Sequence, residues 1–81
     1  MSRASARRLS PFRVRLREAR KARGLKQREL ADAAGIKAGM SICQYEGGQA
    51  EPSLMTLASL CKALDVTADW LVGLSEEGGP E

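Results

Sequence analysis

The chain has 81 residues, enough for one domain. Residues 1–28 hold eleven of the thirteen Lys and Arg residues and one acid, a net charge of +10, whereas residues 29–81 hold two Lys and nine acids, a net charge of −7. This asymmetry favours a polyanionic partner for the basic end. It contains no histidine, and Cys43 and Cys61 match neither a zinc pattern nor a disulfide framework, so we expect no metal, no cofactor and no enzyme activity. No apolar run approaches the ~20 residues of a membrane span, and we expect a cytoplasmic protein with no membrane partner.

The N-terminal third is predicted to form a basic arm followed by a helix. Residues 1–9 are small, polar and basic without periodicity, which is typical of a disordered arm. Ser10 and Pro11 predict a helix start, because a capping hydroxyl precedes a proline at the first helical position, and Gly24 is expected to end this helix. The predicted inward stripe comprises Phe12, Leu16, Ala19 and Ala22 or Arg23.

Two short helices are predicted next, joined by a turn. The first covers residues 27–34, with Lys26 at the position where a capping Ser or Thr is usual and Gly35 as its end. Residues 36–39 form the turn, and the second helix runs from about Met40 to Glu46, before Gly47 and Gly48. The residues expected to face inward are Leu30, Ala31, Ala34, Ile42 and Tyr45.

The remaining residues predict two further helices and a tail. Ser53 is expected to cap a helix that ends at Leu64, and Thr67 a last short helix. The stripe of the longer helix comprises Leu54, Leu57, Ala58, Leu60, Cys61 and Leu64, and both cysteines are expected to behave as small hydrophobes. Residues 75–81 are acidic and Gly-rich, which predicts a flexible tail. The chain is therefore predicted to be all-α, a compact five-helix domain over residues 10–74.

The two short helices with a glycine-containing turn are typical of a helix-turn-helix. The stretches GLKQRELADAAGI, SICQYEGG, PSLMTLASLCKALDV and ADWLVG follow one another in the order of the lambda-repressor/Cro type of helix-turn-helix, also called the xenobiotic-response-element family. The chain resembles this family over residues 13–74. The resemblance implies a lambda-repressor-like DNA-binding domain.

The resemblance also implies roles for individual residues. Gln27, at the start of the second helix, is expected to meet a DNA phosphate through its side chain and backbone N–H, and Gln44 to face base edges. Arg20 and Glu46 match an ion pair that joins the first and third helices in the family. The expected DNA contacts are Lys26, Gln27, Arg28, Lys37, Ala38, Gly39, Met40, Ser41 and Gln44, with Arg3, Arg7 and Arg8 of the arm.

Two features depart from the family pattern. Gly35 and Tyr45 are ten steps apart, one more than is usual, so the turn or the start of the third helix is remodelled. The reading face has few hydrogen-bonding side chains, and Glu51 would repel a nearby phosphate. Affinity is therefore expected to come largely from the N-terminal third, where the candidates for DNA backbone contacts within the domain are Arg13, Arg15, Lys26 and Arg28.

One helix-turn-helix covers only a few base pairs, so we expect a homodimeric repressor on a palindromic operator, with no small-molecule effector. The predicted dimer interface is Trp70, Leu71 and Leu74, although Trp70 could instead close the monomer core. A controller of a restriction-modification operon is a variant of this hypothesis. The alternative is a protein-interaction module, an antitoxin or anti-repressor; Glu51 and the sparse reading face favour it, and the arginine-rich arm opposes it.

Overall fold

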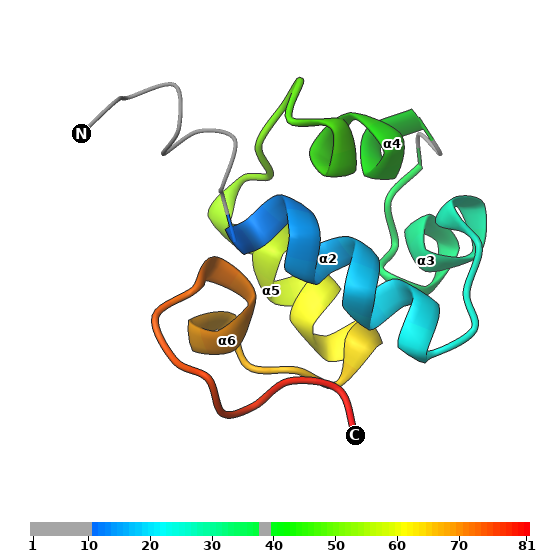
Figure 1. Ribbon diagram of the computed structural model, residues 1–81. Helices are drawn as coiled ribbons and strands as arrows, with labels where there is room; N and C mark the ends of the chain where they lie inside the picture. The colour runs from blue at the N-terminus through cyan, green and yellow to red at the C-terminus, as the bar shows by residue number, and fades with distance from the viewer. Residues whose placement is uncertain (1–10, 38–39) are drawn as a thin grey trace.

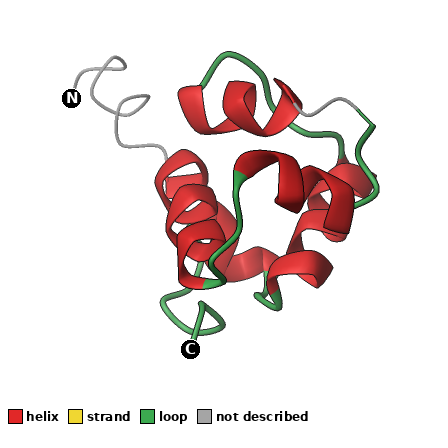
Figure 2. Cartoon of the chain, turned by 90° about the vertical axis from the view of Figure 1, so that its right-hand side faces the viewer, coloured by secondary structure: helices red, strands yellow, loops and turns green. Residues whose placement is uncertain are grey.

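Helix α2 lies at the centre of the domain, with α4 above it, α3 near its C-terminal end and α6 on the opposite side from α4 (Figure 1). The structure is a computed structural model that describes residues 11–37 and 40–81. Its helices are α2 (Pro11–Ala22), α3 (Gln27–Ala33), α4 (Met40–Gly47), α5 (Leu54–Leu64) and α6 (Ala68–Val72). These ranges contain no strand (Figure 2), and the predicted all-α, five-helix class is confirmed. None of their helices has the length and apolar character needed to cross a membrane.

The helix starts follow the predicted capping chemistry. Ser53 Oγ accepts a hydrogen bond from the Thr56 N–H at 3.2 Å, and Thr67 Oγ1 accepts one from the Trp70 N–H at 3.1 Å. Lys26 precedes α3 as the sequence indicated, and its ammonium has no acceptor to offer. The start of α3 is instead stabilised by Glu29, whose Oε1 accepts a hydrogen bond from the Lys26 N–H at 2.8 Å.

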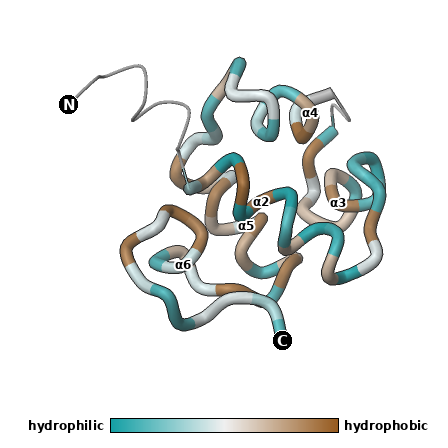
Figure 3. Tube along the Cα trace, viewed as in Figure 1, coloured by the Kyte–Doolittle hydropathy of each residue, from teal (hydrophilic) through white to brown (hydrophobic). Residues whose placement is uncertain are grey.

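The hydrophobic core combines residues from all five helices, and hydrophobic and hydrophilic residues alternate along α2 and α5 (Figure 3). Most of the predicted inward residues are buried or half-buried: Phe12, Leu16, Ala19, Leu30, Ala31, Ala34, Ile42, Tyr45, Leu57, Leu60, Cys61 and Leu64. The predicted stripe of α2 was wrong at its end, since Ala22 and Arg23 are exposed and Arg20 is buried in their place. Leu54 and Ala58 are also exposed, because α5 turns its Leu57, Leu60 and Leu64 face inward.

Residues 75–81, expected to be a flexible tail, fold back against α6 in the structure. The Thr67 N–H donates to the Gly78 carbonyl at 3.0 Å. Gly79 lies so close to Trp70 that a Cβ there would be 2.6 Å from the ring carbon Cε2. The physical reason is that Trp70 presents a large apolar ring near the surface, which these small residues cover. Composition alone does not reveal such a partner.

Arg15 joins this segment to α2. Its Nη1 donates to the carbonyls of Trp70 at 2.6 Å and Ser75 at 2.8 Å, and its Nη2 to Glu76 Oε2 at 3.0 Å. The guanidinium carbon lies 5.0 Å from the centroid of the Trp70 ring, a cation–π distance. The arginine also places positive charge at the C-terminal end of α6, which a helix dipole favours. Arg15 was expected as a DNA backbone contact; in the structure its guanidinium makes three hydrogen bonds to residues of the domain itself.

We expect Arg15→Ala to lower the free energy of unfolding by about 2 kcal/mol, because two backbone carbonyls lose a charged donor. Arg15→Lys should recover only part of this loss, since an ammonium cannot reproduce the flat fork of the guanidinium. Urea unfolding followed by circular dichroism measures both effects. The matched control is Arg17→Ala on the exposed face of α2, which should change the free energy by less than about 0.5 kcal/mol. Equal losses for the two alanine variants would contradict this role of Arg15.

Candidate nucleic-acid interface

Helices α3 and α4 pack against each other across a small residue. Ala31 is buried on α3, and Ile42 of α4 is fully buried in the same core. Gly35 adopts φ +74° between the two helices, in the left-handed region that glycine enters most readily. The Ile36 N–H then donates to the Ala31 carbonyl at 2.8 Å and closes the turn. Because Ile42 points into the core, the opposite face of α4 points away from the core.

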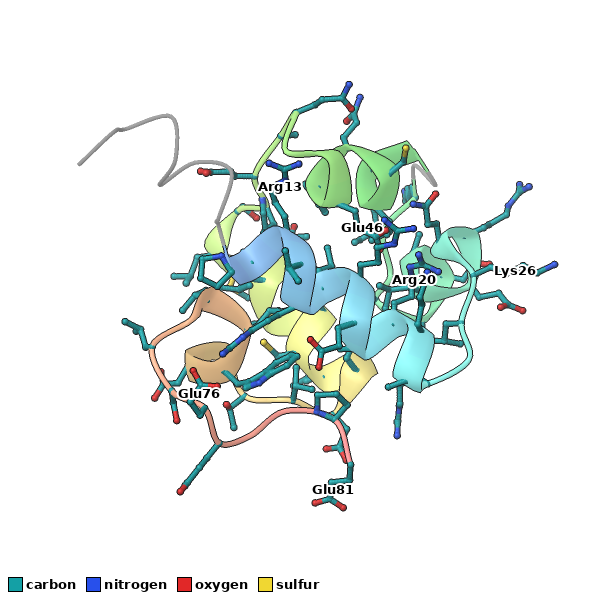
Figure 4. The ribbon with its side chains drawn as sticks, viewed as in Figure 1. Arg13, Arg20, Lys26, Glu46, Glu76 and Glu81 are labelled. Carbon is teal, nitrogen blue, oxygen red and sulfur yellow. The ribbon has the colours of Figure 1, made fainter. Side chains whose placement is uncertain are left out.

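A buried ion pair holds α4 to α2. Arg20 Nε lies 2.6 Å from Glu46 Oε2 and Nη2 3.2 Å from Oε1, while Nη1 donates to the Leu25 carbonyl at 2.8 Å. The two side chains are only 11 % and 7 % exposed, and they point toward each other between α2 and α4 (Figure 4). The pair expected from Arg20 and Glu46 is therefore present. Such a two-point contact fixes orientation as well as distance.

Gln27 brings α3 into the same cluster. Its side-chain Nε2 donates to Glu46 Oε1 at 3.1 Å, so one carboxylate connects the first turn of α3, the last turn of α4 and the last turn of α2. The sequence predicted that this side chain meets a DNA phosphate; in the structure its amide is bonded inside the protein. The backbone N–H of Gln27 lies in the first turn of α3, where the Lys26 side chain provides no cap.

The outward side of α3 and α4 carries most of the other expected contact residues that the structure describes. Lys26, Arg28 and Lys37 are exposed, and Ser41 and Gln44 are half-buried on α4. Met40 is the first residue of α4. Five of the expected contacts lie outside the described residues: Arg3, Arg7, Arg8, Ala38 and Gly39.

The sequence interpretation missed the exposure of Cys43, which was expected to behave as a small hydrophobe and is exposed on α4. The available signal was its position directly after Ile42, since one helical step turns a side chain about 100° from the buried direction. Cys61 is buried as expected, and burial raises the pKa of its thiol. Within residues 11–37 and 40–81 no three His, Cys, Asp or Glu side chains gather in a way that would hold a metal ion.

The residues predicted to form a dimer interface divide between core and surface. Trp70 and Leu71 are buried in the domain, 5 % and 0 % exposed, whereas Leu74 is 80 % exposed. The structure therefore corrects the prediction for Trp70 and Leu71, because a side chain that fills the monomer core presents no surface to a partner. The alternative, that Trp70 closes the core, is what the structure describes.

We expect Arg20→Met and Glu46→Leu each to lower the free energy of unfolding by about 3–5 kcal/mol, because each leaves one buried charge without its partner. The double variant should lose less than the sum of the two, by about 0.5–3 kcal/mol. Chemical unfolding of all four proteins completes the cycle. Strictly additive losses would contradict a direct interaction between the two side chains.

Comparison with known proteins places these features in a family. The family model described as Helix-turn-helix matches residues 16–71. The chain is 37 % identical over 67 residues to the uncharacterized HTH-type transcriptional regulator YobD of Bacillus subtilis, covering 83 % of this chain and 59 % of that protein. It is 39 % identical over 61 residues to the SPbeta prophage-derived uncharacterized HTH-type transcriptional regulator YonR of the same organism, covering 75 % and 56 %. The chain thus spans less than two thirds of the length of either relative.

A solved structure has the same fold over most of its length. The restriction-modification controller protein C.AhdI from Aeromonas hydrophila superposes with a TM-score of 0.71 at 38 % sequence identity, covering 78 % of this chain and 94 % of that one. The fold, the packing of α3 on α4 and these likenesses lead to one assignment: the chain belongs to the helix-turn-helix family, of the lambda-repressor/Cro type expected from its motifs.

Proposed function

We propose that this domain binds double-stranded DNA through α3 and α4 and serves a sequence-specific transcriptional regulator, acting as a repressor on a palindromic operator. The family consists of DNA-binding regulators rather than enzymes, and the two relatives are named as transcriptional regulators. The observation that carries the proposal is the buried cluster of Arg20, Gln27 and Glu46. It holds α4 in one orientation with its outward face available for a DNA groove.

The charges around α3 suit the DNA backbone. Lys26 and Arg28 are exposed at the first turn of α3, and Lys37 is exposed in the turn before α4. Figure 4 shows Lys26 pointing away from the domain on the side of α3. Each such residue that meets a phosphate displaces condensed counterions, so it adds affinity that weakens with salt and carries no sequence information.

Base reading falls to α4. Gln44 can donate to and accept from one base edge at the same time, a pattern that suits adenine in the major groove. Ser41 offers one hydroxyl, and the exposed Cys43 offers a weak donor. We therefore assign the main base contact among the described residues to Gln44.

A specific observation favours a controller of a restriction-modification operon as a second candidate. The controller protein C.AhdI is covered over 94 % of its length, so the likeness extends to nearly the whole of that protein. For the two regulators of Bacillus subtilis, by contrast, the likeness covers little more than half of the length. The genes next to the one that encodes this chain would separate the two candidates.

Selection of bound DNA from a random pool should return a palindrome, and fluorescence anisotropy on that sequence should show strong salt dependence. Arg28→Ala should weaken binding to all sequences and lower the slope of log K against log salt by about 0.9 per lost phosphate contact. Gln44→Ala should instead relax the preference at one base position, by about 1–3 kcal/mol. Lys62→Ala is the matched control, because Lys62 is an exposed cation on the last turn of α5, away from α4 (Figure 1). A wild-type protein with no salt-sensitive binding would contradict the proposal.

We also propose that the domain binds its operator as a homodimer. Two half-sites about one helical turn apart need two helix-turn-helix units, and the domain has exposed apolar side chains that an interface would cover. Leu74 is exposed after α6, and Leu54 and Met55 are 79 % and 75 % exposed in the first turn of α5. The expected interface therefore includes Leu74 or the first turn of α5.

Sedimentation equilibrium with Leu74→Arg and Leu54→Arg tests this proposal. At least one variant should convert a dimer to a monomer while keeping its helical content, since an arginine at the centre of an apolar interface is desolvated without a partner. Val14→Arg, at another exposed apolar position, is the control and should stay dimeric. A monomeric wild-type protein that occupies one short, non-palindromic site would contradict dimerisation.

A further inference from the structure

The residue directly after α4 is a glycine, Gly48, with a left-handed backbone conformation. Gly48 adopts φ +79°; its N–H donates to the Tyr45 carbonyl at 3.3 Å, and the Gln49 N–H donates to the Gln44 carbonyl at 2.9 Å. These two bonds satisfy carbonyls that a helix end otherwise leaves without partners. The next carbonyl, that of Glu46, accepts its hydrogen bond from outside the helix, from Arg13 Nε on α2 at 3.4 Å.

Arg13 also lies directly on Gly48. A Cβ at Gly48 would stand 2.8 Å from both Cζ and Nε of Arg13, closer than real Cβ atoms come to a neighbour. The guanidinium therefore sits over the bare backbone at the end of α4, where the negative end of the helix dipole favours a cation. Figure 4 shows Arg13 reaching from α2 toward this end of α4. Its neighbour Phe12 contacts Tyr45 edge to face, with ring centroids 6.4 Å apart.

We propose that Arg13 is a positioning residue for α4, an inference that rests on DNA binding by this helix. Arg13 donates a hydrogen bond to the backbone carbonyl of Glu46, while Arg20 forms an ion pair with its carboxylate. Two arginines of α2 therefore bind one residue of α4 at two points. Helix α4 has only eight residues and cannot fix its own direction. Two grips on its last turn set its tilt and its rotation, and therefore the direction in which Gln44 meets a base.

The charge of Arg13 suggests a different role on sequence grounds, a contact with a DNA phosphate. The two roles differ in what a substitution changes. Loss of a phosphate contact reduces the number of counterions released, so the salt slope falls by about 0.9 and all DNA sequences are affected alike. Loss of a positioning contact leaves the salt slope unchanged and weakens binding to the selected operator more than binding to unrelated DNA.

The DNA-binding experiment compares Arg13→Met, which keeps an unbranched apolar stem but removes the guanidinium, with Arg17→Met on the exposed face of α2. We expect Arg13→Met to lower the ratio of operator to unrelated-DNA affinity about tenfold, as the loss of one charge-assisted hydrogen bond implies, with an unchanged salt slope. Arg17→Met should keep the wild-type ratio. A slope lowered by about 0.9 with an unchanged ratio would assign Arg13 to a phosphate and overturn the inference.

A second experiment uses no DNA and separates this inference from the proposed function. Native-state hydrogen exchange should be about tenfold faster at the Gly48 and Gln49 amides in Arg13→Met, because the end of α4 opens more often without the contact to Arg13. A tenfold change corresponds to about 1.4 kcal/mol in the free energy of local opening. The Gly24 amide, which donates to Lys21 at the end of α2, should keep its wild-type rate. Unchanged exchange at Gly48 and Gln49 would overturn the inference even if the protein binds DNA.

Gly48→Ala supplies a matched test of the close approach. Gly24 has a similar φ, +70°, but open space around its missing Cβ, so Gly24→Ala carries the same backbone strain without a clash. We expect the double variant Gly48→Ala, Arg13→Met to increase the exchange rate at Gln49 by less than the product of the two single increases. Both substitutions displace the same guanidinium, so their effects overlap. The effects of Gly24→Ala and Arg13→Met should multiply. Multiplying effects in both pairs would contradict the contact between Arg13 and Gly48.

Discussion

The buried carboxylate of Glu46 is the interaction on which the proposed DNA-binding surface depends. Its two oxygens receive hydrogen bonds from Arg20 on α2 and Gln27 on α3, and the residue itself lies on the last turn of α4. Three separate helices are thereby held in one arrangement. A buried ion pair is weak evidence of net stability, because desolvating two charges offsets much of their attraction. Its contribution here is to select one orientation of α4.

Helix α2 supplies most of the groups that fix the domain, and this changes the meaning of its charge. Arg15 binds the end of α6, Arg20 binds the carboxylate of Glu46, and Arg13 lies on the end of α4. The basic character of the N-terminal third was interpreted from the sequence as a sign of a polyanionic partner. Part of that charge serves helix ends and a buried carboxylate within the domain, so exposed cations such as Lys26, Arg28 and Lys37 carry the electrostatic argument within the described domain.

The sequence predicted the fold more completely than the site, for a physical reason. Caps at Ser53 and Thr67 and the spacing of Leu57, Leu60 and Leu64 are local signals, and a helix responds to local signals. The half-buried place of Arg15 depends on contacts with a segment some sixty positions away, and the docking of residues 75–81 depends on their fit to Trp70. No periodicity encodes such contacts. Arg20 and Glu46 were found only because a family resemblance supplied their pairing.

Because α4 has few side chains that can hydrogen-bond to bases, the selectivity of DNA binding depends strongly on how the helix is positioned. Gln44 is the one long amide side chain on the helix, so few other base contacts can compensate if the helix tilts. A hydrogen bond to a base edge weakens steeply when its angle departs from linear, and a rotation of the helix moves the end of a long side chain further than its backbone. Selectivity from few contacts therefore requires a rigid support behind them. Three side chains meet at Glu46, those of Arg13, Arg20 and Gln27. They support α4 from within the domain, so this support is the same whichever DNA sequence is bound.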